Sequence, residues 1–288
     1  MPRRNPTYLL AIDQRHCAFQ IHFKFTKMDL ITKMETNIIY NEDCLIGMSK
    51  IDNKSIDMVL CDLPYGTTNC EWDKVIPLEK LWAEYRRVIK DNGAIVLTSQ
   101  QPFTTDLINS ARDIFRYEII WDKISKMGFL SANKRPLRRH ENIIIFYKKL
   151  PVYNVQKEKI DVKDMGRARK TRSGLYEGYS TARSNSWVET GYRFPSSILK
   201  ITNWNGAIFG KTENAVKHPT QKPVPLFSWL IRTYTNEDDV ILDNCMGSGT
   251  TAISCLQENR KYIGFETNEK YYNDSINRIE KCKLELTK

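Results

Sequence analysis

The chain has 288 residues, of which 41% are hydrophobic and 27% charged, and its net charge is +10. This length and apolar content suit one large α/β domain with an insertion, which we expect rather than two smaller domains. The positive balance favours a polyanionic partner, nucleic acid first, over an acidic small molecule. No apolar run approaches the roughly eighteen residues that a membrane span needs, and the apolar stretch 8–12 is too short for a signal-peptide core. We therefore expect a soluble, cytoplasmic protein.

The first 33 residues differ from the rest, because they mix charges and show no clear period before a strand pattern begins at residue 37. We expect residues 1–33 to be an N-terminal appendage. One hypothesis is that function effectively begins at Met28 or Met34, and it predicts that a chain lacking residues 1–33 stays active.

From residue 37 onward, strand patterns alternate with helix patterns, which is typical of a mostly parallel sheet covered on both faces. Short apolar runs predict strands at 37–40, 56–60, 94–98, 117–121, 142–147, 240–242 and 261–265. Helical periods lie between them at 78–89, 102–115, 223–234, 249–258 and 268–282. The sequence thus predicts an α/β fold with a mostly parallel sheet.

The alternation stops at 150–215, where Gly, Ser, Arg and Tyr dominate, and we interpret this interval as an inserted recognition region. Positive charge is concentrated nearby, since residues 123–172 hold fifteen Lys or Arg against four acids, a net +11. A solvated basic loop would explain the charge equally well. The aromatic residues beyond it favour a folded surface that stacks on bases, or a subdomain core: Tyr176, Tyr179, Trp187, Tyr192, Phe194 and Trp204.

Asp62, Leu63, Pro64 and Tyr65 follow the strand expected at 56–60. Pro64 fixes its own φ and biases Leu63 toward an extended conformation, so the carbonyls of this turn should point in set directions beside the carboxylate. Hydrogen-bond acceptors then converge on one amino group, and Tyr65 offers an aromatic face. This combination can hold a flat, amino-bearing ring.

A second feature, residues 243–250, also follows a strand and opens a helix. Gly247, Gly249 and Ala252 fit the loose pattern of a nucleotide-type site at a helix N-terminus, and Glu266 ends the next strand where a ribose-binding acid would sit. A Gly-Ser-Gly turn alone can equally be a tight strand-to-helix connection. A P-loop is disfavoured because no Gly-Lys-Ser/Thr follows at its spacing. Both features fall at strand carboxyl ends, where open α/β sheets bind ligands.

The two features and the segment 218–223, His-Pro-Thr-Gln-Lys-Pro, resemble in order and spacing the β-group of amino DNA methyltransferases. The resemblance spans about residues 36 to 283. It implies an S-adenosylmethionine-dependent enzyme with a three-layer Rossmann-like fold and a circularly permuted motif order. The expected parts are a catalytic half at 34–149, a target-recognition insertion at 150–215 and a cofactor-binding half at 216–288.

The resemblance implies that Asp62, Leu63, Pro64 and Tyr65 form the catalytic tetrapeptide. Asp62 and a backbone carbonyl would accept both hydrogens of the target amino group, which favours a pyramidal nitrogen with a more available lone pair. Tyr65 would stack on the base, which must rotate out of the duplex. Leu63 stands where Pro is commoner, which removes some rigidity but no acceptor. Positioning and preorganised acceptors would supply most of the acceleration.

The resemblance also implies a set of cofactor-binding residues. Gly247, Ser248 and Gly249, with Asp243 leading in, match the loop around the methionine part, while Glu266 matches the acid at the ribose. Asn244 and Cys245 stand where the family usually has Pro and Phe, so the pocket wall there should differ in shape. The full expected set is Asp43 (near the adenine), Thr220, Lys222, Asp243, Cys245, Gly247, Ser248, Gly249 and Glu266.

The leading Asp62 favours adenine N6 as the target by resemblance, with cytosine N4 as the alternative. Two other classes stay open: a dinucleotide-dependent oxidoreductase, which would leave the tetrapeptide without a purpose, and a catalytically silent nucleic-acid-binding protein. An RNA or protein-amide methyltransferase shares related chemistry but fits the late cofactor motif and basic insertion less well.

Double-stranded DNA is the expected partner, and pairing within this group makes a homodimer an option. Most of the candidate DNA-contacting arginines should bind phosphates: Arg135, Arg138, Arg139, Arg167, Arg169 and Arg172. Lys123 lies near the expected substrate face but would serve equally as a solvated lysine. Glu141 could touch DNA or form a simple ion pair. The seven scattered cysteines form no Cys-x-x-Cys pair, so we expect reduced thiols and no bound metal.

Overall fold

The computed structural model describes residues 34–67, 73–159, 191–203 and 221–287, which belong to a unit spanning residues 33–288. Within these residues, eight strands form one sheet in the order β1-β10-β9-β2-β3-β5-β4-β8. Their bounds are β1 Ile38–Tyr40, β2 Ile56–Asp62, β3 Ile89–Ser99, β4 Phe115–Met127, β5 Arg138–Phe146, β8 Ile198–Lys200, β9 Val240–Asp243 and β10 Lys261–Phe265. Strands β6 (Glu158–Lys159) and β7 (Tyr192–Arg193) pair separately. The predicted appendage lies outside the described residues.

The sheet is mostly parallel, as predicted. β1, β10, β9, β2 and β3 run parallel to one another, whereas β5 is antiparallel to both β3 and β4, and β8 is parallel to β4. The inner strand β2 is buried along most of its length. Its near-continuous apolar run is typical of a parallel strand covered on both faces.

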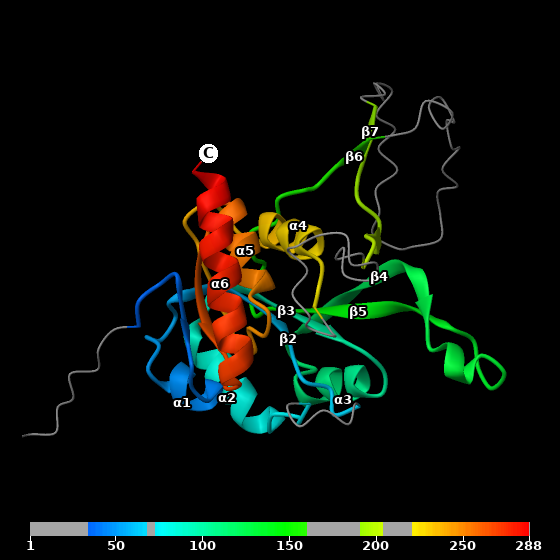
Figure 1. Cartoon of the computed structure of the whole chain (residues 1–288), viewed down its shortest axis with the longest axis horizontal. Coiled ribbons are helices and arrows are strands. Elements are labelled where there is room, and N and C mark those ends of the chain that lie inside the picture. Colours follow the sequence, from blue (N-terminus) through cyan, green and yellow to red (C-terminus); the bar gives the residue numbers. More distant parts are fainter. Residues whose placement is uncertain (1–33, 68–72, 160–190, 204–220, 288) are drawn as a thin grey trace, which may run out of the picture. The chain divides into compact units, whose positions relative to one another are not determined.

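Helices cover both faces of the sheet and give the three predicted layers (Figure 1). One hydrophobic core joins the sheet to α4 (Val224–Tyr234), α5 (Thr250–Gln257) and α6 (Glu269–Leu286). The other core joins it to α1 (Cys44–Ser49), α2 (Leu78–Val88) and α3 (Phe103–Ser110). Alternate residues of one strand enter different cores, as Leu60 and Cys61 do. None of the helices in the described part of the chain is long and apolar enough to cross a membrane.

The structure confirms the seven predicted strands and shows three differences. β4 and β5 extend beyond their apolar runs into a long antiparallel hairpin that carries a 3-10 turn, η1 (Phe129–Ser131), near its end (Figure 1). The short helix α1 was not predicted, because six residues are too few for a helical period. β8 lies inside the interval 150–215 yet joins the main sheet, and its three residues include a single buried side chain, Leu199.

The sheet topology brings the two predicted loops together. β2 and β9 are direct neighbours and run parallel, so the loops after Asp62 and Asp243 leave the same edge of the sheet. The chain continues from β2 to β3 on one side and from β9 to β10 on the other. Because the connections diverge there, a crevice opens between the two loops.

Candidate active site

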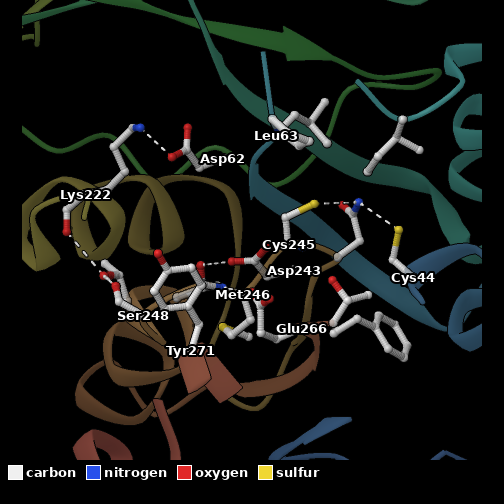
Figure 2. A pocket seen from close by; sticks show the side chains of 18 of the residues that line it. Cys44, Asp62, Leu63, Lys222, Asp243, Cys245, Met246, Ser248, Glu266 and Tyr271 are labelled. Atoms are coloured by element: carbon white, nitrogen blue, oxygen red, sulfur yellow. Dashed lines mark hydrogen bonds and ion pairs between the residues drawn. The ribbon is translucent and has the colours of Figure 1, made fainter. Parts of the chain in front are cut away.

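A cavity of about 380 Å³ lies at the carboxyl ends of β2 and β9. Asp62 and Leu63 line it from the β2 side, while Gly247 and Ser248 line it from the loop after β9. Figure 2 shows Lys222, Asp62, Asp243, Glu266 and Tyr271 around this space. The loops predicted to share a site therefore border one cavity.

A second cavity, of about 330 Å³, adjoins the first. The two share Asp62, Leu63, Gln221 and Lys222 in their linings. The remaining wall of the second cavity combines aromatic and charged side chains, among them Tyr65, Trp121, Lys123, Glu141, Arg135 and Arg138. The Asp62 carboxylate thus lies where a nucleotide-sized cavity meets a cavity suited to a flat ring.

The Asp62 side chain accepts hydrogen bonds through both oxygens. Oδ1 accepts from the Tyr65 hydroxyl at 2.7 Å and from the Thr98 hydroxyl. Oδ2 accepts from the Lys222 ammonium at 2.5 Å. The Tyr65 ring is stacked on Phe103, with centroids 5.6 Å apart and planes 27° apart. These contacts hold the predicted acceptor and aromatic ring in fixed positions.

The role of Thr98 was missed from sequence. This residue ends an apolar strand run, and in the sheet it is paired in register with Asp62. Since the end of a parallel strand next to a candidate loop is where ligand-facing residues occur, its position was the available signal. The contact of Phe103 with Tyr65 had no sequence signal, because α3 is separated from β2 by an entire helix and strand.

Four buried or partly buried charges meet between the cavities. Lys222 contacts Asp62 and also lies 3.6 Å from Glu141 Oε2, while Lys123 forms an ion pair with Glu141 Oε1. Lys123 is only 6% exposed, so its interpretation as a solvated lysine was wrong. For Glu141 the ion-pair interpretation is confirmed. Burial alone would lower the pKa of Lys222, but the nearby carboxylates of Asp62 and Glu141 outweigh it and raise that pKa.

The loop after β9 is held open by two glycines with positive φ, Gly247 at 53° and Gly249 at 77°. A Cβ on Gly249 would also lie 3.1 Å from Ser275 Cβ, a tight contact, so both the conformation and the limited space favour glycine there. Glu266 accepts the Gly247 N–H at 2.8 Å, which ties the loop to the end of β10. Arg278 donates to the Ser248 carbonyl at 2.8 Å, a contact not foreseen from sequence.

The other predicted cofactor residues differ in what the structure shows of them. Asp43 lines the first cavity, but its carboxylate caps α1 by accepting the N–H groups of Leu45 and Ile46 at 2.9 and 3.2 Å. Cys245 lines the cavity beside Asn244, whose amide accepts a hydrogen bond from Tyr85. Lys222 lies between the cavities rather than within the cofactor cavity alone. Thr220 lies outside the described residues.

Asp243 shapes the loop and does not face freely into the cavity. It is 2% exposed and accepts hydrogen bonds from the Thr251 hydroxyl and, at 3.0 Å, from the Cys245 N–H. Burial raises its pKa to about 6 despite these donors. The neutral carboxyl is therefore favoured by folding relative to an exposed aspartate.

Asp243→Asn should remove part of the pH dependence of stability. Because the folded pKa is raised from an unfolded value of about 4, stabilisation by the protonated Asp243 is complete below pH 4 and is lost as pH rises through about 6. Over this pH range the contribution of Asp243 to the free energy of unfolding falls by about 3 kcal/mol at most. Urea unfolding at pH 4 to 7.5 should show a shallower fall in the free energy of unfolding for Asp243→Asn, and parallel profiles would contradict this.

Two of the predicted DNA-contacting arginines, Arg135 and Arg138, are exposed and line the second cavity from the β4–β5 hairpin. Arg139 instead forms a bidentate ion pair with Asp122, at 2.7 and 2.8 Å. Arg167, Arg169 and Arg172 lie outside the described residues. Of the six predicted arginines, Arg135 and Arg138 are thus the two that the described residues place at the second cavity without an ion pair to an acid.

The sheet, the divergent loops and the joined cavities are typical of α/β proteins that bind a nucleotide-type ligand at the carboxyl ends of their strands. Residues 56–277 match the family of N6 and N4 methyltransferases, which is described as DNA methylase. The chain belongs to this family of amino DNA methyltransferases, which confirms the resemblance to its β-group.

Several proteins are similar over most of the chain. The type II methyltransferase M1.MboII of Moraxella bovis is 25% identical in an alignment 272 positions long. The alignment covers 86% of this chain and 99% of that protein. The DNA adenine methyltransferase YhdJ of Escherichia coli K12 is 26% identical over 261 residues, 85% of this chain and 83% of that protein.

Solved structures share the fold. The complex of M1.HpyAVI with S-adenosylmethionine has a TM-score of 0.55 at 22% identity and covers 83% of this chain and 98% of that one. The cytosine-N4-specific PvuII DNA methyltransferase has a TM-score of 0.59 at 18% identity, with 87% and 91% covered.

Proposed function

We propose that this protein transfers a methyl group from S-adenosylmethionine to the exocyclic amino group of a base rotated out of double-stranded DNA, with adenine N6 as the target. The observation that carries the proposal is the Asp62 carboxylate at the junction of the two cavities. A donor of methyl groups in the first cavity and a base in the second would both adjoin this side chain.

S-adenosylmethionine is the cofactor, and the residues of the first cavity fit it. Glu266 places a carboxylate beside the glycine loop, suited to a ribose diol, and Gly247, which lines the cavity, has no side chain to keep a ligand from the loop backbone. When bound, the cofactor supplies an electrophilic methyl group on a positively charged sulfur. We propose the other cavity-lining residues of the predicted set, including Asp43 and Ser248, as its further contacts.

The residues of this chain act on the base amine by accepting and orienting its hydrogens. An exocyclic amine is a weak nucleophile because its lone pair is delocalised into the ring. Asp62, held by Tyr65 and Thr98, and a carbonyl of the turn at Leu63–Pro64 accept the two N–H bonds, which favours a pyramidal nitrogen. Burial and the carboxylates of Asp62 and Glu141 raise the pKa of Tyr65, so its hydroxyl stays a hydrogen-bond donor. Preorganised groups of this kind need little reorganisation during transfer.

The choice of base is testable directly. The leading Asp62 of the tetrapeptide favours adenine. Among the similar proteins, YhdJ is a DNA adenine methyltransferase, whereas the PvuII enzyme is cytosine-N4-specific. Duplex DNA incubated with the protein and S-adenosylmethionine should yield N6-methyladenine on nucleoside mass analysis, with RNA and protein substrates run in parallel. N4-methylcytosine would overturn the base assignment, and no methylated base in DNA would overturn the function.

Sequence-independent DNA affinity should depend on Arg135 and Arg138. The double variant Arg135→Ala/Arg138→Ala is expected to weaken binding and to make the slope of log K against log salt shallower by about 2, since each phosphate contact contributes about 0.9. Filter binding at several salt concentrations measures this. Arg112→Ala, an exposed arginine near the end of α3, is the control, and an unchanged slope in the double variant would exclude phosphate contacts there.

A further inference from the structure

The catalytic acceptor already accepts three hydrogen bonds in this structure. Oδ1 accepts from two hydroxyl groups, which use both of its lone pairs, so the incoming amine must bind at Oδ2, where Lys222 already donates to one of the two lone pairs. The hydroxyls of Tyr65 and Thr98 belong to elements packed in the core, whereas a lysine side chain has several rotatable bonds. Lys222 is therefore the donor that can leave.

Lys222 is anchored at its backbone and confined at its head. Its carbonyl accepts from the Thr250 hydroxyl at 3.2 Å, and Pro223 follows as the N-cap of α4. The side chain is 8% exposed and its ammonium lies 5.7 Å from the centre of the Tyr65 ring. An ammonium this buried cannot leave one carboxylate without a new partner nearby, because an unpaired buried charge is strongly unfavourable.

Glu141 supplies such a partner. Its Oε1 accepts from Lys123, while Oε2 is buried and accepts no hydrogen bond. Oε2 lies 3.6 Å from Lys222 Nζ, just beyond hydrogen-bond length. A small rotation of the lysine head would therefore exchange the contact with Asp62 for one with Glu141 and keep the ammonium paired.

We propose that Lys222 moves from Asp62 to Glu141 when the target amine enters the second cavity, so that Glu141 is a positioning residue that frees the catalytic acceptor. This inference rests on the proposed function. The four charges, Asp62, Glu141, Lys123 and Lys222, sum to zero in either arrangement, so the exchange moves no net charge into the site.

Lys222 then couples the two cavities, because it lines both. When Lys222 contacts Asp62, it competes with the amine for the acceptor oxygen. When it contacts Glu141, that oxygen is free and the charge of Glu141 is neutralised. If Glu141 served only to pair with Lys123, nothing would require its second oxygen, Oε2, to lie beside Lys222 without accepting a hydrogen bond. The two interpretations make different predictions for substitutions.

Glu141→Gln removes the second carboxylate and leaves two ammonium groups with Asp62 alone, so Lys222 should stay on Asp62. We expect kcat to fall about 10- to 100-fold, the scale of a misplaced catalytic group, while KM for DNA and the Kd of S-adenosylmethionine stay within about twofold. The control is Glu118→Gln, an exposed glutamate on β4 of the same hairpin, which should behave as the unmodified protein.

The decisive variant adds Lys222→Met to Glu141→Gln. It frees Asp62 and restores a neutral cluster, so kcat should rise at least about fivefold above that of Glu141→Gln alone, measured at saturating cofactor to offset any loss of affinity. A structural role for Glu141 predicts a further fall instead, and that fall would overturn the proposal. Inactivity of the unmodified protein on DNA would mean instead that the proposed function fails.

A structure of the unmodified protein with duplex DNA and the cofactor analogue sinefungin gives a test that is independent of variant folding. Lys222 Nζ should lie within hydrogen-bond distance of Glu141 Oε2, and Asp62 Oδ2 should accept from the base amine. An ammonium still on Asp62 Oδ2, with the base seated beside Tyr65, would exclude the exchange.

Discussion

Asp62→Ala should lower the rate of methyl transfer by about 10³-fold, the scale for removal of a preorganised group that stabilises a transition state. The substitution removes the acceptor at the junction of the two cavities and leaves the Tyr65 and Thr98 hydroxyls without the carboxylate that orders them. Single-turnover assays with labelled S-adenosylmethionine on duplex DNA measure the effect.

Cofactor binding is the internal control for this variant. The Gly247 loop and Glu266 make no hydrogen bond to Asp62, so the Kd of S-adenosylmethionine from calorimetry should change by less than about threefold. Asp52→Ala, an exposed aspartate before β2, should leave turnover unchanged. If Asp62→Ala kept near-normal turnover, the assignment of the catalytic acceptor would be wrong.

Glu266→Ala should raise the Kd of S-adenosylmethionine about 10- to 100-fold, because a hydrogen bond to a charged group contributes about 1.5–3 kcal/mol. The carboxylate has two tasks: it is the proposed partner of the ribose hydroxyls, and it fixes the Gly247 and Asn268 N–H groups, each at 2.8 Å. Calorimetric titration of the DNA-free protein separates this loss from any effect on the base.

One further variant tests the role of the Glu266 carboxylate, and another is the control. Glu266→Gln keeps one acceptor oxygen and should give an intermediate Kd, whereas Glu269→Ala, exposed in the first turn of α6, should bind as the unmodified protein does. At saturating cofactor, turnover by Glu266→Ala should recover. A persistent deficit there, with normal affinity, would place Glu266 in the chemical step and contradict a binding role.

Some strands of the sheet could be predicted from the sequence, and others could not. Strands such as β2 and β9 were predicted because both faces are buried and the apolar run is continuous. β8 was not, because a three-residue edge strand carries almost no pattern, and its pairing with β4 depends on a long return of the chain. The extension of the β4–β5 hairpin past its apolar runs was likewise decided by pairing rather than by composition.

The sequence by itself determined the order of the seven predicted strands and the five predicted helices, the turn at Asp62–Tyr65 and the glycine loop at Gly247, because each depends on short-range periodicity or on the φ restrictions of Pro and Gly. Only the tertiary structure decided that Thr98 supports Asp62 and that Lys222 and Glu141 meet beside it. These partners lie far apart in the chain, and a buried charge reveals its partner only once the fold has removed both from water.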